Sequence, residues 1–113
     1  MSFEVKLSEY AISDLAGIGD YIEFQLGSPQ AANKALADIF EVIQMLGEYL
    51  ESGVSISAPA NAYRVFICEK RYAISYIFDK DLQRVWIYRV FHTTQDWLAL
   101  LLKRSQDSQA GQE

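Results

Sequence analysis

The stretch FEVKLSEYAISDLAGIGDYIEFQLGSPQAA, residues 3–32, carries the signals that decide the fold. Apolar and charged side chains alternate over residues 3–7, which predicts a short half-buried strand. Ser8 follows where a hydroxyl can accept an orphan backbone N–H and so cap a helix. Over residues 9–26 the apolar side chains recur at helical spacing. Gly27 then suits a left-handed C-terminal cap, so we expect a strand followed directly by a helix.

A second helix is predicted over residues 30–46, where apolar side chains again fall on one face. Ser28 can cap this helix, and Pro29 stands at its first position, where the missing N–H costs nothing. Because only Gly27 and Ser28 join the two helices, they must fold back as an antiparallel hairpin. Both apolar faces can then cover one sheet.

The second half of the chain is predicted to form an antiparallel meander. Residues 48–61 have no clear periodicity, and a loop of this length is often functional or mobile. Three runs rich in Val, Ile, Tyr, Phe and Trp follow, at Tyr63–Cys68, Tyr72–Phe78 and Arg84–Phe91. A last helix is expected over Gln95–Arg104.

These elements predict an α+β fold with the order β-α-α-β-β-β-α, a helical hairpin packed on a small antiparallel sheet. We expect a single domain over residues 1–104 and a disordered C-terminal tail over residues 105–113. Regular alternation in the last strand would put Arg89 on the same face as Val85, Ile87 and Phe91, with Val90 on the opposite face.

Composition narrows the function classes. The chain has 113 residues, half of them apolar, and a formal net charge of −5, which is unlike most nucleic-acid binders. The charge is uneven, because residues 1–60 carry −7 and residues 61–104 carry +4. The single cysteine, Cys68, cannot form an internal disulfide, which favours a reducing compartment. With no leader and no apolar run of membrane-spanning length, we expect a cytoplasmic protein without a membrane partner.

Few residues suggest chemistry. One His and one Cys make no paired metal-ligand spacing, and the chain has no glycine-rich phosphate loop, so no metal and no cofactor are expected. Arg64, Arg89 and His92 remain, together with the acids of the 48–61 loop. The guanidiniums of Arg64 and Arg89 could together bind a phosphate or an acidic peptide.

Each of these side chains also has a structural interpretation. An arginine in an apolar strand must reach the open side of the sheet or find a buried carboxylate. For Arg89 the more common case is an ion pair with a helix acid such as Asp14 or Asp20. His92 would then be a strand-end residue bonded to a helix cap.

Four motifs, in order along residues 3–98, resemble the RelE/ParE toxin superfamily. They are Val5-Lys6-Leu7-Ser8 with Ala11, Asp14, Leu15, Ile18, Tyr21 and Ile22; Gly27-Ser28-Pro29 with Ala31-Ala32; Tyr63-Arg64-Val65 with Tyr72, Ile74 and Tyr76; and Val85, Ile87, Arg89-Val90-Phe91-His92 with Gln95-Asp96. The resemblance implies the toxin of a type II toxin–antitoxin pair, bound and neutralised by a small cognate antitoxin. A dimer or a toxin–antitoxin hetero-oligomer is also compatible with it.

Members of this superfamily act in two ways, and the sequence is closer to the ParE-like members. These poison DNA gyrase, whereas RelE-like members cut mRNA on the ribosome. The pattern of residues 89–92 and Asp96 resembles the ParE side, and the chain has no lysine between Lys34 and Lys70, where a RelE-like nuclease carries basic residues. We therefore expect growth inhibition through gyrase. The alternatives are a ribosome-dependent mRNA endonuclease and an inactive toxin fold that survives as a binding module.

The expected site residues follow from these alternatives. For target or antitoxin binding they are Arg64, Arg89, His92, Trp97, Lys103 and Arg104. For a nuclease they are Arg64, Arg89, His92 and Glu51, with Glu48 as a second candidate base.

Overall fold

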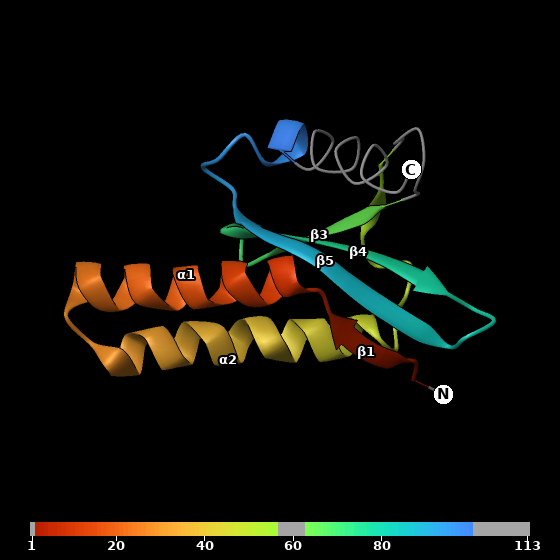
Figure 1. The fold of residues 1–113 in the computed structure, drawn as a ribbon, viewed down its shortest axis with the longest axis horizontal. Coiled ribbons are helices and arrows are strands. Elements are labelled where there is room, and N and C mark those ends of the chain that lie inside the picture. Colours follow the sequence, from red (N-terminus) through yellow and green to blue (C-terminus); the bar gives the residue numbers. More distant parts are fainter. Residues whose placement is uncertain (1, 57–62, 101–113) are drawn as a thin grey trace.

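The computed structural model describes residues 2–56 and 63–100, which form a helical hairpin on one face of a five-stranded sheet (Figure 1). The elements are β1 (Glu4–Leu7), α1 (Glu9–Leu26), α2 (Pro29–Leu46), β2 (Val54–Ser55), β3 (Arg64–Cys68), β4 (Tyr72–Asp79) and β5 (Arg84–His92). The predicted fold class, a helical hairpin on a small sheet, is confirmed.

Both helices begin and end where the sequence predicts. The Ser8 hydroxyl accepts the Ala11 N–H at 3.0 Å and donates to the carbonyl of Tyr88 at 2.6 Å, so the cap of α1 is also fixed to β5. Gly27 adopts a φ of +62°, the left-handed conformation that glycine tolerates best. The Ser28 hydroxyl accepts the Ala31 N–H at 3.2 Å and starts α2.

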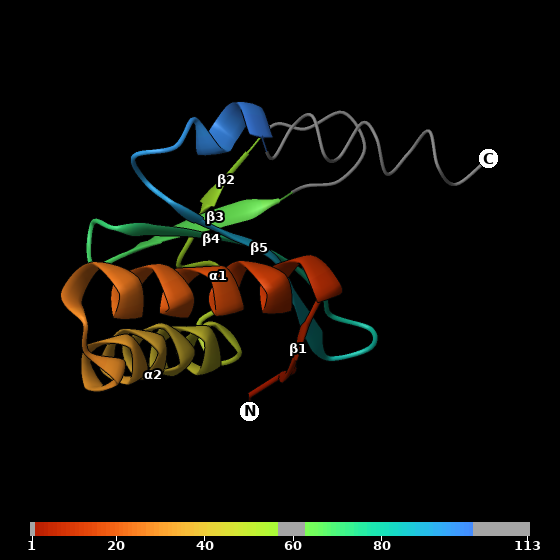
Figure 2. The same cartoon turned by 60° about the vertical axis from the view of Figure 1, so that its left-hand side comes forward.

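The sheet has the strand order β1-β5-β4-β3-β2 and differs from the prediction in two respects. β1 runs parallel to β5, with Glu4 opposite Arg84, while the other pairings are antiparallel. The hairpin carries the chain across one face to the far edge, and the meander then returns to β1 in the same direction (Figure 2). The short strand β2 lies inside the predicted 48–61 loop and pairs with β3.

A β-bulge in β5 corrects the predicted alternation. Ser75 pairs with Arg89 and Tyr76 pairs with Ile87, so Tyr88 is an extra residue between them. The Ser75 hydroxyl accepts the Arg89 N–H at 3.0 Å and donates to the Arg89 carbonyl at 3.2 Å. Beyond the bulge Val90 joins the core under the helices and Phe91 packs on the other face, which is the reverse of the prediction.

Apolar side chains pack on both faces of the sheet. The larger core lies between the sheet and the hairpin and contains Ile39, Ile43 and Tyr76, each with no exposed surface. A second cluster on the opposite face contains Tyr63, Val65, Ala73 and Phe91. Trp97 packs against this second cluster from the segment that follows β5.

The chain turns helical again at residues 97–100, on the sheet face opposite the hairpin (Figure 1). A helix after the last strand is predicted over Gln95–Arg104, and the observed turn begins two residues later than predicted. Residues 101–104 and the predicted tail lie outside the described residues. Within the described ranges, neither helix is long and apolar enough to cross a membrane.

Candidate functional site

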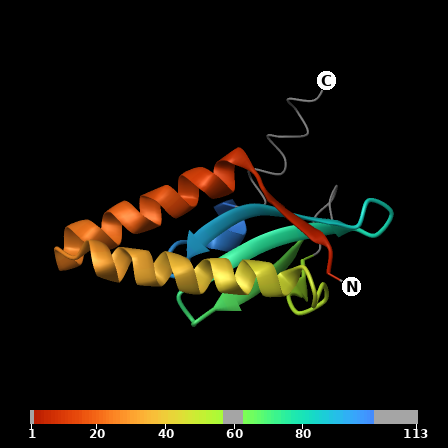
Figure 3. The same cartoon turned by 90° about the horizontal axis from the view of Figure 1, so that it is seen from below.

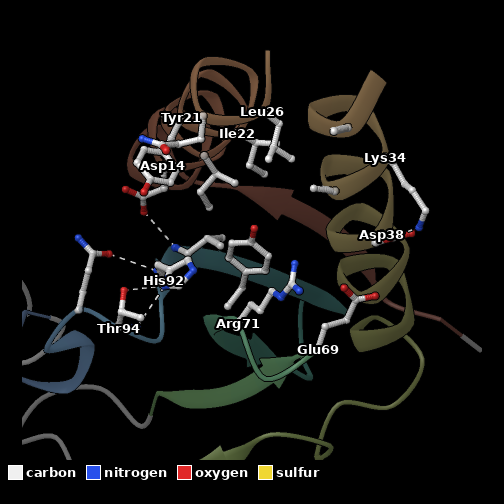
Figure 4. A pocket seen from close by; sticks show the side chains of 18 of the residues that line it. Asp14, Tyr21, Ile22, Leu26, Lys34, Asp38, Glu69, Arg71, His92 and Thr94 are labelled. Carbon is white, nitrogen blue, oxygen red and sulfur yellow. Dashed lines mark hydrogen bonds and ion pairs between the residues drawn. The ribbon is translucent and has the colours of Figure 1, made fainter. Parts of the chain in front are cut away.

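A groove of about 1100 Å³ lies between the helical hairpin and the end of the sheet where β5 stops (Figure 4). The groove forms because the closed end of the hairpin extends beyond the strands (Figure 3). Helix faces that would otherwise rest on the sheet therefore overhang it. Such concave, largely apolar surfaces are the usual binding sites of small domains.

The apolar wall of the groove belongs to α1. Ile18, Ile22 and Leu26 line it at a spacing of four residues, so they lie one above the other on the same helix face. Tyr21 also lines the groove and is 63% exposed, while Leu26 is 67% exposed. This wall can bury substantial apolar surface when a partner covers it.

The facing wall belongs to α2 and is more polar. Lys34 and Asp38 line it and form an ion pair of 3.1 Å between their charged atoms, one helical turn apart. Because Lys34 is bonded to its own helix, its charge is partly neutralised before any partner arrives. The pair is exposed and contributes little to stability.

The floor of the groove comes from the tight turn between β3 and β4. Glu69 and Lys70 adopt φ values of 52° and 62°, and the Arg71 N–H closes the turn on the Cys68 carbonyl at 3.0 Å. Thr93 fixes this turn to the end of β5, because its N–H donates to the Arg71 carbonyl at 2.7 Å and its hydroxyl to the Lys70 carbonyl at 2.9 Å.

Tyr72 is the next residue of the floor and is almost fully buried. Burial raises the pKa of the Tyr72 phenol, because a phenolate would lose its hydration, and the positive charge of Arg71 offsets part of that rise. The phenol therefore stays protonated at neutral pH and can only donate or accept a hydrogen bond there.

His92 stands at the rim of the groove, at the end of β5. Its ring nitrogen Nδ1 accepts the Thr94 N–H at 3.2 Å and lies 2.7 Å from the Thr94 hydroxyl. The Tyr72 ring meets the imidazole edge-on at 5.5 Å between centroids. Because the Thr94 N–H occupies Nδ1, the neutral ring carries its proton on Nε2. His92 is therefore a strand-end residue bonded to the following turn, but its partner Thr94 is not the predicted helix cap, because the helical turn begins only at Trp97.

Arg89 forms an ion pair with Asp14, as its structural interpretation predicts. Its Nε and Nη2 atoms donate to the two Asp14 carboxylate oxygens at 2.7 and 2.9 Å, and the Val90 N–H donates to the same carboxylate at 3.0 Å. Both side chains are less than one-fifth exposed. The hydrogen bonds that Arg89 donates to Asp14 raise the pKa of Arg89 above its usual value, despite an opposing effect of burial.

Arg64 also has partners within the protein. Its Nε donates to the Gly53 carbonyl at 3.1 Å and its Nη2 to the Glu51 carbonyl at 3.4 Å. Tyr76 holds the same segment, because its hydroxyl accepts the Gly53 N–H and donates to the Leu50 carbonyl, both at 2.8 Å. Arg64 therefore anchors the first part of the predicted 48–61 loop.

The structure does not gather the predicted site residues in one place. Arg64 lies on β3 and Arg89 on β5, with β4 between them, which separates their backbones by about 10 Å. Among the predicted residues that the structure describes, only His92 lines the groove, and Trp97 packs on the opposite face of the sheet. Lys103 and Arg104 lie outside the described residues. No cluster of three or more metal-binding side chains occurs in the described part of the chain.

Sequence reasoning missed several groove residues, chiefly Tyr21, Ile22 and Arg71. The helical spacing of Ile18, Ile22 and Leu26 was visible, but it indicated a buried face. Nothing local shows that the hairpin extends past the sheet.

The comparisons with known proteins agree with this fold. A family model described as the ParE toxin of type II toxin-antitoxin system, parDE, matches residues 5–97. A chromosomal ParDE toxin–antitoxin system from P. aeruginosa contains a chain with a TM-score of 0.67 and 22% identity, and the match covers 80% of this chain and 96% of that one. In the RelBE2 toxin–antitoxin complex from Mycobacterium tuberculosis, a chain has a TM-score of 0.62 and 20% identity, and the match covers 81% and 92%. Among curated proteins none matches.

Proposed function

The chain belongs to the ParE toxin family of type II toxin–antitoxin systems, and from that premise we propose that it stops growth by inhibiting DNA gyrase. The observation that carries the proposal against an mRNA endonuclease is that both candidate arginines are bonded inside the protein. Arg64 donates to two backbone carbonyls, and Arg89 donates to Asp14. A reacting phosphate would have to compete with these internal partners for either guanidinium, which disfavours the endonuclease.

A metal-free ribonuclease needs a base, an acid and a cationic stabiliser around one phosphate. Among the predicted nuclease residues, Arg64 and Glu51 lie at one end of β3, and His92 lies at the groove. The formal net charge of −5 also opposes binding to the polyanionic ribosome. Both points favour a protein target over an RNA target. A cytoplasmic location is part of the same proposal, because gyrase acts there.

The purified protein should inhibit supercoiling of relaxed plasmid by purified gyrase in a dose-dependent way. The parallel assay adds the same protein to translating ribosomes and maps mRNA ends by primer extension, where we expect no new ends. Codon-phased cuts with intact supercoiling would replace the gyrase proposal with the endonuclease. Absence of both effects, together with normal growth on induction, would leave the inactive binding module.

We further propose that a segment of the cognate antitoxin fills the groove. The support is the exposed apolar wall of α1, with Tyr21 and Leu26 each more than 60% exposed. Both structural neighbours are described as toxin–antitoxin systems or complexes, although their low identity compares only the fold.

A matched pair of substitutions on α1 tests the groove. Tyr21→Glu places a charge in the apolar wall and should weaken antitoxin binding at least tenfold, as measured by titration calorimetry. Phe24→Glu is the control, because Phe24 lies on the same helix, is 83% exposed and does not line the groove. Equal loss for both variants, or no loss for either, would move the antitoxin to another surface.

A further inference from the structure

The groove contains one guanidinium that forms no hydrogen bond or ion pair with the residues that the structure describes. Of the four arginines in the described ranges, Arg64 bonds to backbone carbonyls, Arg84 lies 3.4 Å from Glu4, and Arg89 pairs with Asp14. Arg71 makes no side-chain hydrogen bond or ion pair with any described residue. A guanidinium has five donors in a fixed plane, so Arg71 has its full bonding capacity available to a partner.

The position of Arg71 directs that capacity into the groove. Its side chain rises from the floor into the space between α1 and α2 (Figure 4). Glu69 lies on the same turn, yet its carboxylate is beyond ion-pair distance of Arg71. On the α2 wall Lys34 is already bonded to Asp38. Among the described lining residues, Arg71 is therefore the cation without a bonded partner, and its side chain points into the space that an occupant would fill.

The backbone beneath Arg71 is held firmly for such a role. The turn is closed by the Arg71 N–H on Cys68, and Thr93 bonds to the carbonyls of both Lys70 and Arg71. Two non-glycine residues of this turn, Glu69 and Lys70, keep positive φ values, a conformation that persists only where surrounding contacts impose it. Because the backbone that carries Arg71 is already rigid, less conformational entropy is lost when its side chain binds a partner, which favours binding.

We propose that Arg71 binds an acidic side chain of the antitoxin segment in the groove and thereby helps to determine which antitoxin the toxin accepts. This inference rests on the proposed antitoxin groove. The wall formed by Ile18, Ile22 and Leu26 requires apolar residues on the segment, and the guanidinium beside them requires an Asp or Glu. An Arg–carboxylate pair is commonly bidentate, so its strength depends on the orientation of the carboxylate as well as on its charge. An antitoxin lacking that acid would leave a charge buried without a partner, which selects against it.

The test measures the Kd between purified antitoxin, identified as the protein that restores growth when co-expressed, and toxin variants of the β3–β4 turn. Arg71→Gln should raise the Kd by about tenfold to a hundredfold, because a covered charge pair loses one partner. Arg71→Lys keeps the charge without the planar fork and should give an intermediate Kd. Lys70→Gln is the control, because Lys70 shares the turn and its exposure but does not line the groove, so its Kd should stay within about threefold of wild type.

A charge swap identifies the acidic partner. Arg71→Glu should weaken binding further, and changing one antitoxin Asp or Glu to Arg should restore it in that toxin alone. All variants should melt at the wild-type temperature, because the Arg71 side chain is exposed in the free protein and makes no hydrogen bond or ion pair with the described residues.

The failures are distinguishable. If Arg71→Gln binds like wild type while Tyr21→Glu does not, the role of Arg71 is wrong and the groove stands. If neither substitution changes the Kd, the antitoxin does not occupy the groove, and the role of Arg71 falls with that proposal. Equal weakening by Arg71→Gln and Lys70→Gln would mean general attraction to an acidic protein and would overturn a specific contact.

Discussion

Arg89 and Asp14 join β5 to α1 through two short hydrogen bonds, and the pair holds the bulged strand against the helix. Arg89→Gln should lower the free energy of unfolding by about 2–3 kcal/mol, because it leaves a partly buried carboxylate without its charged donor. Urea denaturation followed by far-UV circular dichroism measures the change.

The exposed pair between Lys34 and Asp38 is the control for that substitution. Lys34→Gln should cost less than about 0.5 kcal/mol, since exposed pairs one helical turn apart contribute little. If Arg89→Gln instead keeps the wild-type unfolding free energy and loses toxicity, then Arg89 meets the target, as one of the sequence hypotheses states.

Cys68 is a buried free thiol at the end of β3. Burial, with smaller effects of Glu69 and Asp38, raises the pKa of this thiol. The thiolate is therefore disfavoured in the folded state, and the stability of the fold should fall as pH rises above about 8.5, where the unfolded thiol ionises.

The reactivity of Cys68 checks this directly. At pH 8 the native protein should react with a chromogenic disulfide roughly a hundredfold more slowly than the urea-unfolded protein, because reaction requires opening of the core. A native rate equal to the unfolded rate would show that the end of β3 is open to solvent.

At the scale of elements, the segment after α2 depends on Tyr76 and Gly53. A Cβ at Gly53 would lie 2.8 Å from the Tyr76 ring and hydroxyl and 2.9 Å from the Val65 backbone. Gly53→Ala should therefore displace the segment, and Tyr76→Phe should leave the Gly53 N–H and the Leu50 carbonyl without a partner. Each change should destabilise the protein by about 1–3 kcal/mol in thermal unfolding.

Gly17 supplies the opposite case on α1. A Cβ there meets nothing within 4 Å, and glycine inside a helix is less favourable than alanine. Gly17→Ala should stabilise the protein by about 0.5–1 kcal/mol. Destabilisation by both glycine substitutions would show that the assay responds to any change rather than to the contact at Gly53.

The helices could be predicted from the sequence because their signals are local. Ser8, Gly27, Ser28 and Pro29 each act on the nearest turn of chain, and all four do what their types predict. β2 and the bulge at Tyr88 could not be predicted, since both depend on distant partners. β2 follows a segment, residues 50–53, that is held by hydrogen bonds from Arg64 and Tyr76. The bulge forms where the Ser75 hydroxyl accepts the Arg89 N–H.

At the scale of the whole molecule, the candidate site was harder to predict than the fold. The expectation that Arg64 and Arg89 act together came from their residue type, yet two different strands direct them to different internal partners. The groove arises from the length of the hairpin relative to the strands, which no short window of sequence records. The sequence alone therefore does not distinguish Arg71 from the other charged residues of the β3–β4 turn.

Substitutions of the two tryptophans show whether the sheet face opposite the hairpin contributes to stability. Trp97 packs on the cluster of Tyr63, Val65 and Phe91, whereas Trp86 is 37% exposed and lies under the Arg84 guanidinium. Trp97→Ala should cost about 2–3 kcal/mol of unfolding free energy, because it uncovers that cluster. Trp86→Ala, the control, should cost less than about 1 kcal/mol, as expected for an exposed cation–π contact.

Toxicity on induction decides between the two roles of Trp97. If the residue only covers the sheet, toxicity should fall in proportion to the unfolded fraction and recover at a lower growth temperature. If Trp97→Ala melts like wild type but is harmless at every temperature, the side chain contacts the target. The sequence prediction that names Trp97 as a binding residue would then stand, and the gyrase-binding surface would lie on the face opposite the groove.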